Sequence, residues 1–353
     1  MEHSLFLSHR SPRSVHTVLS TLVTVRSTLV LIAVSLSFCL ALPPSLTAQT
    51  AGRLEEGITH FEAERFARAQ AVFEALVEAD RRDAAAAYWL GRTLRQEGEY
   101  KDAVDLLEKA VDLDETNVDY QRELYLTYVD FAEEAGALRA VSLAKKMVRL
   151  LHSIVELDSN AADEREELVG FYVNAPKMFG GGDIEQARRL AGELQNIDQK
   201  RGRLAFIMIH EHEGENDQVE REYRALIEEY PDELDPPRNL GLFYHNTERY
   251  AEAIATFRTL TERFPDYLYG WYLVGRTAAV SGLETELGIS CMEHYLAHEP
   301  PEDDPSHAAA HWRLGMICEK SGNLDRARAE YEASLELDPD YSEARAALRR
   351  IRP

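Results

Sequence analysis

The sequence contains little positive charge for its length. Its 353 residues include 39 lysines and arginines against 62 aspartates and glutamates, so the formal net charge is −23. Nucleic-acid binding depends on cationic contacts with phosphate groups, and this balance therefore argues against general nucleic-acid binding. A strongly acidic chain of this kind is expected to be soluble.

The sequence also lacks the short motifs that mark common active sites. It contains no glycine-rich phosphate loop, nucleophile elbow, zinc-protease helix or paired-cysteine zinc pattern. Catalytic residues can be spread along a chain without a local motif, so this absence counts only moderately against an enzyme. We predict a non-catalytic protein that requires no cofactor.

Beyond the amino-terminal region there is no sign of a membrane span. The first 48 residues place arginines before an uncharged apolar run from Leu29 to Leu42, and small residues follow up to Ala48. That order is typical of a secretory signal peptide. The run is shorter than the roughly 20 residues that a membrane-spanning helix needs. We therefore predict a signal peptide at residues 1–48, cleavage after Ala48, and a periplasmic or secreted bacterial protein; an uncleaved membrane anchor is the alternative.

One stretch, from Leu234 to Tyr267, has a pattern typical of two short helices. Apolar and small residues recur in each half at a spacing that places them on one helix face. The first half contributes Leu240, Gly241 and Tyr244, and the second contributes Ala253, Phe257 and Leu260. The small side chains of Gly241 and Ala253 leave room for close approach of the two helices, and Pro265 ends the second because it has no N–H to donate.

This stretch resembles a tetratricopeptide repeat, whose 34-residue pattern is L-G-x-x-Y, then A-x-x-x-F, then P. The match lacks only the first aromatic residue, since Pro237 stands where the pattern has Trp. Copies recur on both sides, and a closing helix from Ser342 to Ile351 follows, with Ser342 as its predicted N-cap. The resemblance implies an all-α fold, a right-handed superhelix (α-solenoid) of about eight helical hairpins with a C-terminal capping helix, over residues 49–353.

Three of the predicted repeats depart from the regular length. The third contains about ten inserted residues, so its helices should be longer, and the seventh has one extra residue before its second helix. In the fourth, Pro176 should end the first helix and Asp183 should cap the second, with Gly180–Gly182 between them. We interpret this glycine loop as structural, and a second contact surface is the alternative.

In proteins that this array resembles, the first helices line a concave groove and fixed positions of each repeat point into it. In this chain those positions are Tyr88, Arg92, Arg95, Phe171, Asn174, Arg238, His245, Tyr272, Arg276 and Trp312. Arginine beside tyrosine or tryptophan is typical of binding hot spots. The resemblance implies a scaffold that binds a peptide or protein segment bearing carboxylates. Alternatively, these residues pair with acidic neighbours or fill the groove themselves, and neither the partner nor the oligomeric state follows from the sequence.

Four histidines suggest a second function. His294 and His298, and then His307 and His311, are each spaced to lie on one helix face, and the two helices should be adjacent. Such imidazoles could ligate a transition metal, so a metal-binding protein is the alternative function. Ordinary surface or interhelix residues are the simpler interpretation.

Two cysteines lie beyond residue 48. The repeat frame places Cys291 and Cys318 on neighbouring helices, and an exported protein could oxidise such a pair. Cysteine is also an ordinary small buried residue, and Cys318 occupies the position of the consensus tyrosine. We favour two free buried thiols over a disulfide.

Overall fold

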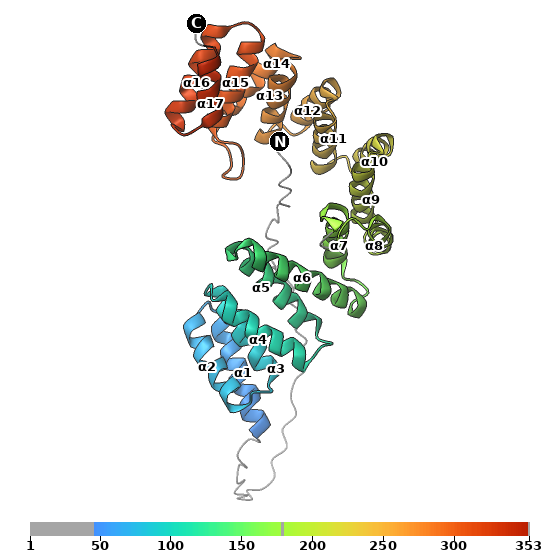
Figure 1. Ribbon diagram of the computed structural model, residues 1–353, viewed down its shortest axis with the longest axis vertical. Helices are drawn as coiled ribbons and strands as arrows, with labels where there is room; N and C mark the ends of the chain where they lie inside the picture. Colours follow the sequence, from blue (N-terminus) through green and yellow to red (C-terminus); the bar gives the residue numbers. More distant parts are fainter. Residues whose placement is uncertain (1–45, 178–179, 352–353) are drawn as a thin grey trace, which may run out of the picture. The chain divides into compact units, whose positions relative to one another are not determined.

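The computed structural model describes residues 46–177 and 180–351 (Figure 1). Residues from Thr50 onward form one structural unit. The predicted signal peptide lies outside the described residues up to residue 45, and its cleavage stays a prediction. None of the described helices is both long enough and apolar enough to span a membrane.

In the described ranges the chain forms seventeen helices and no strand. Eight of them are the first helices of hairpins: α1 (Leu46–Glu62), α3 (Ala84–Gln96), α5 (Val118–Glu134), α7 (Ala162–Asn174), α9 (Gln199–Glu213), α11 (Asp235–Asn246), α13 (Leu268–Ser281) and α15 (His307–Lys320). Eight are second helices: α2 (Phe66–Ala79), α4 (Tyr100–Leu113), α6 (Ala137–Leu157), α8 (Ile184–Ile197), α10 (Asn216–Glu229), α12 (Tyr250–Arg263), α14 (Thr285–Leu296) and α16 (Leu324–Leu337). The last helix is α17 (Ser342–Arg350).

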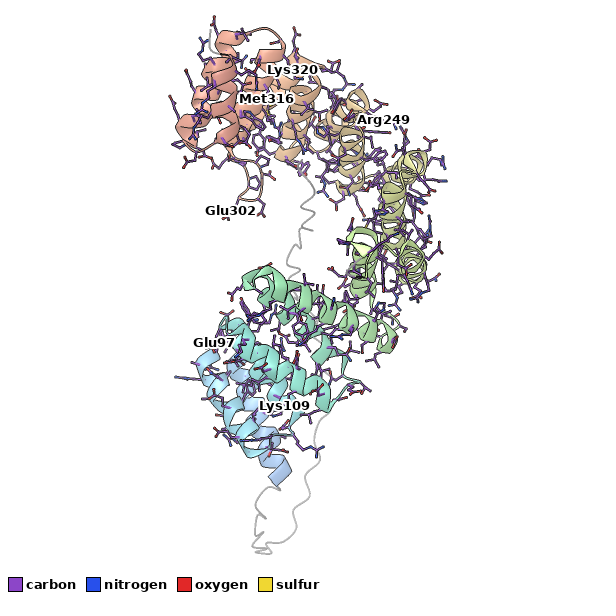
Figure 2. The ribbon with its side chains drawn as sticks, viewed as in Figure 1. Glu97, Lys109, Arg249, Glu302, Met316 and Lys320 are labelled. Carbon is purple, nitrogen blue, oxygen red and sulfur yellow. The ribbon has the colours of Figure 1, made fainter. Side chains whose placement is uncertain are left out.

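From α2 onward each helix packs against the next one along the chain (Figure 1). First helices of neighbouring hairpins also touch, as in α3 with α5, α7 with α9 and α13 with α15. Lys320 at the end of α15 donates to the carbonyl of Val280 on α13 at 2.6 Å (Figure 2). Eight hairpins and a final helix confirm the predicted all-α repeat architecture.

Each regular hairpin closes where a glycine of the first helix meets a large side chain of the second. At five hairpins a Cβ on the glycine would overlap that side chain: Gly57 meets Phe73, Gly91 meets Leu107, Gly241 meets Phe257, Gly275 meets Met292 and Gly315 meets Tyr331. The two residues are sixteen positions apart in four of these pairs and seventeen apart in the seventh hairpin. This difference is the extra residue predicted there, and the tight crossing explains why glycine occupies the position.

The turn inside a hairpin places one residue in the left-handed backbone region. Gly98 and Gly322 adopt φ values of 81° and 83°, which glycine tolerates because it has no Cβ. Glu64 and Glu248 stand at the same position of their repeats with φ values of 55° and 61°. A non-glycine residue is strained in this region, so these two turns carry a small conformational cost.

The third and fourth hairpins have the predicted irregularities. Helices α5 and α6 are 17 and 21 residues long, whereas α3 and α4 have 13 and 14. Helix α7 stops just before Ala175 and Pro176, and the Asp183 carboxylate accepts from the amide of Gln186 at 3.1 Å at the start of α8. The amide of Gly182 donates to the Tyr172 carbonyl at 2.8 Å, so this part of the loop folds back on α7.

The prediction that Ser342 caps the last helix is wrong. Ser342 is the first residue of α17, the N-cap is Tyr341, and no side chain caps the helix. The Ser342 hydroxyl instead donates to the Glu343 carboxylate at 2.8 Å. Because the Ser342 hydroxyl already lies inside the first turn, it is poorly placed to accept a hydrogen bond from the amides two or three residues further on. This explains why Ser342 does not act as the N-cap.

The two cysteines described by the structure are free and buried, which confirms the favoured interpretation. Cys291 belongs to a core cluster that extends from α9 to α14, and Cys318 belongs to another that extends from α13 to α17. Burial raises the pKa of the Cys291 thiol to about 11. Both thiols act as small apolar core groups.

Candidate partner-binding site

The arginines on α3 are neutralised by carboxylates on α5. Arg95 donates from Nε to Asp130 Oδ2 at 2.6 Å and from Nη1 to Glu123 Oε1 at 3.0 Å. Arg92 Nε lies 3.2 Å from Glu123 Oε2. Glu123 is only 8% exposed, and these two guanidinium groups lie against its carboxylate. Two predicted site residues therefore tie neighbouring repeats together.

Aromatic rings surround Arg92 as well. Its guanidinium carbon lies 4.6 Å from the centre of the Trp89 ring, 5.0 Å from Phe61 and 5.4 Å from Tyr88. Tyr88 in turn packs on Tyr120 of α5, with ring centres 4.7 Å apart. The aromatic partners of this arginine thus come from the chain itself.

The predicted residues on α7 carry no charge and make local contacts. Phe171 packs edge-on against Tyr172 with ring centres 5.3 Å apart. The Asn174 amide donates to the Gly170 carbonyl at 3.0 Å and lies 3.9 Å from the Met208 sulfur. Asn174 remains exposed.

Two more predicted site residues make their main contacts with other residues of the chain. Arg238 on α11 pairs with Asp235 at 2.9 Å. Tyr272 on α13 is only 5% exposed and lies between the rings of Tyr269 and Tyr295, at centre distances of 5.9 and 5.3 Å. Tyr272 therefore supports the α13 surface from beneath.

The arginines of α13 and α15 have a different environment. Within the described residues, neither Arg276 nor Arg313 forms an ion pair, although both are half-buried. Burial raises the pKa of the Tyr269 phenol, and the nearby positive charge of Arg276 opposes that rise. The guanidinium carbon of Arg313 lies 4.0 Å from the centre of the Trp312 ring, and its Nη1 lies 3.8 Å from the sulfur of Met316, one turn along α15 (Figure 2). Its Nε is buried without a hydrogen-bond partner.

The charges of Arg276 and Arg313 both affect the pKa of His245 on α11. Its Nδ1 lies 3.0 Å from the Thr277 hydroxyl on α13, so α11 and α13 are joined here. Burial, and then the positive charges of Arg276 and Arg313, lower the pKa of His245 to about 4. Arg276 and Arg313 therefore add positive charge around His245. Two carboxylates act on the same region, since Glu343 interacts electrostatically with Arg313 and Asp304 with Tyr269. We name His245, Tyr269, Arg276, Trp312 and Arg313 the arginine face.

The two arginine regions correspond position by position. Arg92 and Arg276 are both the ninth residue of their repeats, counted from Ala84 and Leu268. The sixth residue of the following repeat is Glu123 in the first case and Arg313 in the second. An arginine–glutamate pair between α3 and α5 is thus replaced by two arginines between α13 and α15.

Arg313 was missed by the sequence reasoning because its position is not among those that line the groove in the family. A signal in the sequence could have revealed it. Where the ninth residue of one repeat is an arginine, the charge of the sixth residue in the next repeat indicates whether that arginine is neutralised. Comparing adjacent repeats would have distinguished the neutralised Arg92 from Arg276.

The structure does not bring the four predicted metal-binding histidines together. His294 and His298 lie close, with ring centres 4.6 Å apart, but His298 Nδ1 is engaged with the His294 carbonyl at 2.8 Å. His307 Nε2 lies 2.9 Å from the His298 carbonyl, and His311 Nδ1 lies 2.8 Å from a Glu330 carboxylate oxygen. Among the described residues these four form no group of three converging ligands, so the metal alternative at this place gains no support.

Comparisons with known proteins agree with the hairpin pattern. Family models described as tetratricopeptide repeat match residues 54–118, 213–286 and 308–341. The unmatched stretch between the first two ranges contains the lengthened α5 and α6 and the glycine loop. No curated protein matches the chain.

A solved structure shows the same fold. A tetratricopeptide repeat protein from Parabacteroides merdae is 12% identical and has a TM-score of 0.51, over 86% of this chain and 98% of that chain. The C-terminal part of a repeat-containing protein from Cytophaga hutchinsonii is 14% identical with a TM-score of 0.49, over 84% and 99%. At 12% identity the likeness to the Parabacteroides merdae protein concerns the fold alone. With the family matches and the eight hairpins, the chain belongs to the tetratricopeptide repeat family.

Proposed function

We propose that this chain is a non-catalytic scaffold that binds a protein segment bearing carboxylates at the arginine face. Tetratricopeptide repeats in general serve protein–protein interaction. At this site the two arginines form no ion pair with the described residues of the chain, so they can bind carboxylates of a partner. The observation that supports the proposal is that Arg276 and Arg313, both half-buried, form no ion pair within the described residues of a chain of net charge −23.

The chemistry of the face favours a planar anion beside an aromatic or apolar group. A guanidinium offers several donors in a fixed plane that match a carboxylate, and it is weakly hydrated compared with an ammonium group. Trp312 and Tyr269 add flat surface beside the two arginines. Distant acidic residues are screened over a Debye length of about 8 Å at physiological salt, so the local positive charge governs the final contact.

The test uses a labelled peptide rich in Glu and Asp with one aromatic residue, and the same peptide with Gln and Asn instead. We expect the full chain to bind the acidic peptide and not the amide peptide, measured by fluorescence polarisation at fixed salt. Arg276→Glu and Arg313→Glu should each weaken binding at least tenfold, because each replaces an attractive charge with a repulsive one.

A matched control makes the same charge change elsewhere. Arg258 on α12 is 57% exposed and pairs only loosely with Glu262, at 3.8 Å, so Arg258→Glu should leave peptide binding unchanged. Equal affinity of the wild-type chain, Arg276→Glu and Arg313→Glu for the acidic peptide would overturn the proposed site. Capture of a natural partner from cell-envelope extract by the wild type, but not by these two variants, would then identify the ligand.

The proposed location is the bacterial cell envelope, with the mature chain in the periplasm or secreted. This part of the proposal rests on the order of charged, apolar and small residues in residues 1–48. Fractionation of cells followed by amino-terminal sequencing should find Gln49 as the first residue in the soluble periplasmic or extracellular fraction. Retention in the membrane with residues 1–48 attached would support the uncleaved anchor instead.

A further inference from the structure

The turn between α9 and α10 brings one imidazole and two carboxylates together. His210 lies in the last turn of α9, Glu213 ends that helix, and Glu215 precedes α10. Gly214 between them adopts φ 74°, which reverses the chain and places Glu215 beside His210. Nδ1 of His210 lies 2.5 Å from a carboxylate oxygen of Glu215.

Ligating atoms of all three side chains lie within 4.8 Å of one another. In the part of the chain that the structure describes, they form the one such group of three among histidine, cysteine, aspartate and glutamate. Metal–ligand bonds of about 2.0–2.2 Å place two ligands of the same ion up to about 4 Å apart, so small rotations of exposed carboxylates would suffice to enclose an ion. The group lies on residues unrelated to the arginine face.

A cavity of about 370 Å³ adjoins this turn. It lies among α8, α9 and α10, and its lining residues are Gln195, Gln199, Arg203, Phe206, His210 and Glu222. His210 belongs both to the cavity and to the group of three ligands. A cavity of this size and polarity has room for water, which could complete the coordination of an ion that has only three protein ligands.

We propose that His210, Glu213 and Glu215 bind one divalent transition-metal ion, with Zn²⁺ the best fit. A mixed set of one imidazole and two carboxylates suits zinc and its first-row neighbours. Calcium and magnesium prefer sites made of oxygen ligands alone and are the poorer candidates.

One residue of the chain competes with the ion. The Arg188 guanidinium on α8 forms an ion pair with the Glu213 carboxylate. Metal binding must therefore displace a cation that already neutralises one of the ligands. This competition gives the proposal an unusual signature, because removal of Arg188 should strengthen metal binding although Arg188 is not a ligand.

The experiment is calorimetric titration of the chelator-treated full chain with Zn²⁺ alone. We expect one ion per chain, at least tenfold weaker binding in His210→Ala and in Glu215→Gln, and severalfold tighter binding in Arg188→Gln. His212→Ala is the matched control, since His212 lies two residues away on the same helix and outside the group, and it should bind as the wild type does. Circular dichroism of each variant checks that the hairpin is still folded.

The proposal is overturned if the wild type takes up no Zn²⁺, or if Glu215→Gln and His210→Ala, both folded, bind it as tightly as the wild type. It is also overturned if uptake disappears in His294→Ala or His298→Ala and persists in His210→Ala, because the ion would then occupy the other histidine pair. Unchanged affinity in Arg188→Gln would contradict the competition and with it the assignment of Glu213 as a ligand.

Discussion

The α3–α5 region and the α13–α15 region are built on the same repeat positions but treat their arginines in opposite ways. In the first region Arg92 and Arg95 surround the buried carboxylate of Glu123 and hold two repeats together. In the second, neither Arg276 nor Arg313 forms an ion pair within the described residues, and burial together with these two charges lowers the pKa of His245 to about 4. The position of an arginine in a repeat therefore does not decide its role, because the residue at the sixth position of the next repeat determines whether its charge is neutralised.

The largest expected effect concerns His245, which stands at the repeat position of Arg95. Its pKa of about 4 in the folded chain lies below its ordinary value of 6.5, so protonation favours the unfolded state. Stability should be fully present above pH 6.5 and lost as the pH falls toward 4, by about 2–3 kcal/mol after allowance for solvent screening of the partly exposed imidazole. The measurement is urea unfolding at several pH values, and His245→Gln should lose much less over the same range. Equal acid losses in both chains would show that burial and the neighbouring arginines do not lower the pKa of His245 in the folded chain.

The next effect separates the two regions by stability. Arg95→Ala removes both ion pairs of Arg95 and leaves Glu123 partly uncompensated, so unfolding free energy should fall by about 2 kcal/mol. Arg276→Ala removes no ion pair and relieves repulsion, so its effect should stay within about 0.5 kcal/mol. Urea midpoints of the two variants give the comparison, and similar losses in both would remove the distinction.

A third substitution, Arg313→Glu, gives the α13–α15 region the charge arrangement of the α3–α5 region. Arg313→Glu restores the arginine–glutamate combination of Arg92 and Glu123, and it should stabilise the chain by about 0.5–1 kcal/mol through a pair with Arg276. The new negative charge should also raise the pKa of His245, which NMR titration of the imidazole would report. A His245 pKa that stays near 4 in this variant would mean that Arg313 lies too far away to influence it.

The last prediction concerns a backbone feature that two hairpins outside the α3–α5 and α13–α15 regions share. Glu64 and Glu248 hold the same left-handed turn position in the first and sixth hairpins. Glu64→Gly and Glu248→Gly should each stabilise the chain by about 0.5–1 kcal/mol, because glycine removes the strain of a positive φ. Thermal unfolding measures both, and Gly98→Ala is the converse control that should destabilise. A gain in only one of the two turns would show that the hairpins are not equivalent even in their backbone.

The fold could be predicted from the sequence because its determinants are local. Gly241 and Phe257 lie within one hairpin, and their spacing alone specifies a close crossing. The seventh hairpin kept this contact between Gly275 and Met292 despite its extra residue. Gly170 follows an apolar residue as the crossing glycines do, but a Cβ built on it would meet no other atom. The sequence could not show this difference, because it depends on how α7 is placed against α8.

The candidate site was only partly predictable because it depends on contacts between repeats. The ten residues taken from the family pattern include His245, Arg276 and Trp312, which belong to the arginine face. They also include Tyr272, whose burial depends on the rings of α14, and Arg92, whose partner lies on α5. The His210 group lies at a turn whose residues were considered only for their repeat pattern, so its convergence became visible only in three dimensions.

The separation of sixteen or seventeen residues between each crossing glycine and its partner also has a kinetic consequence. A contact that closes so short a segment costs little chain entropy, so any regular hairpin can start folding independently of distant parts of the chain. The longer α5 and α6 and the glycine loop interrupt that series in the middle. We expect the two ends to nucleate separately and the central hairpins to complete the array last.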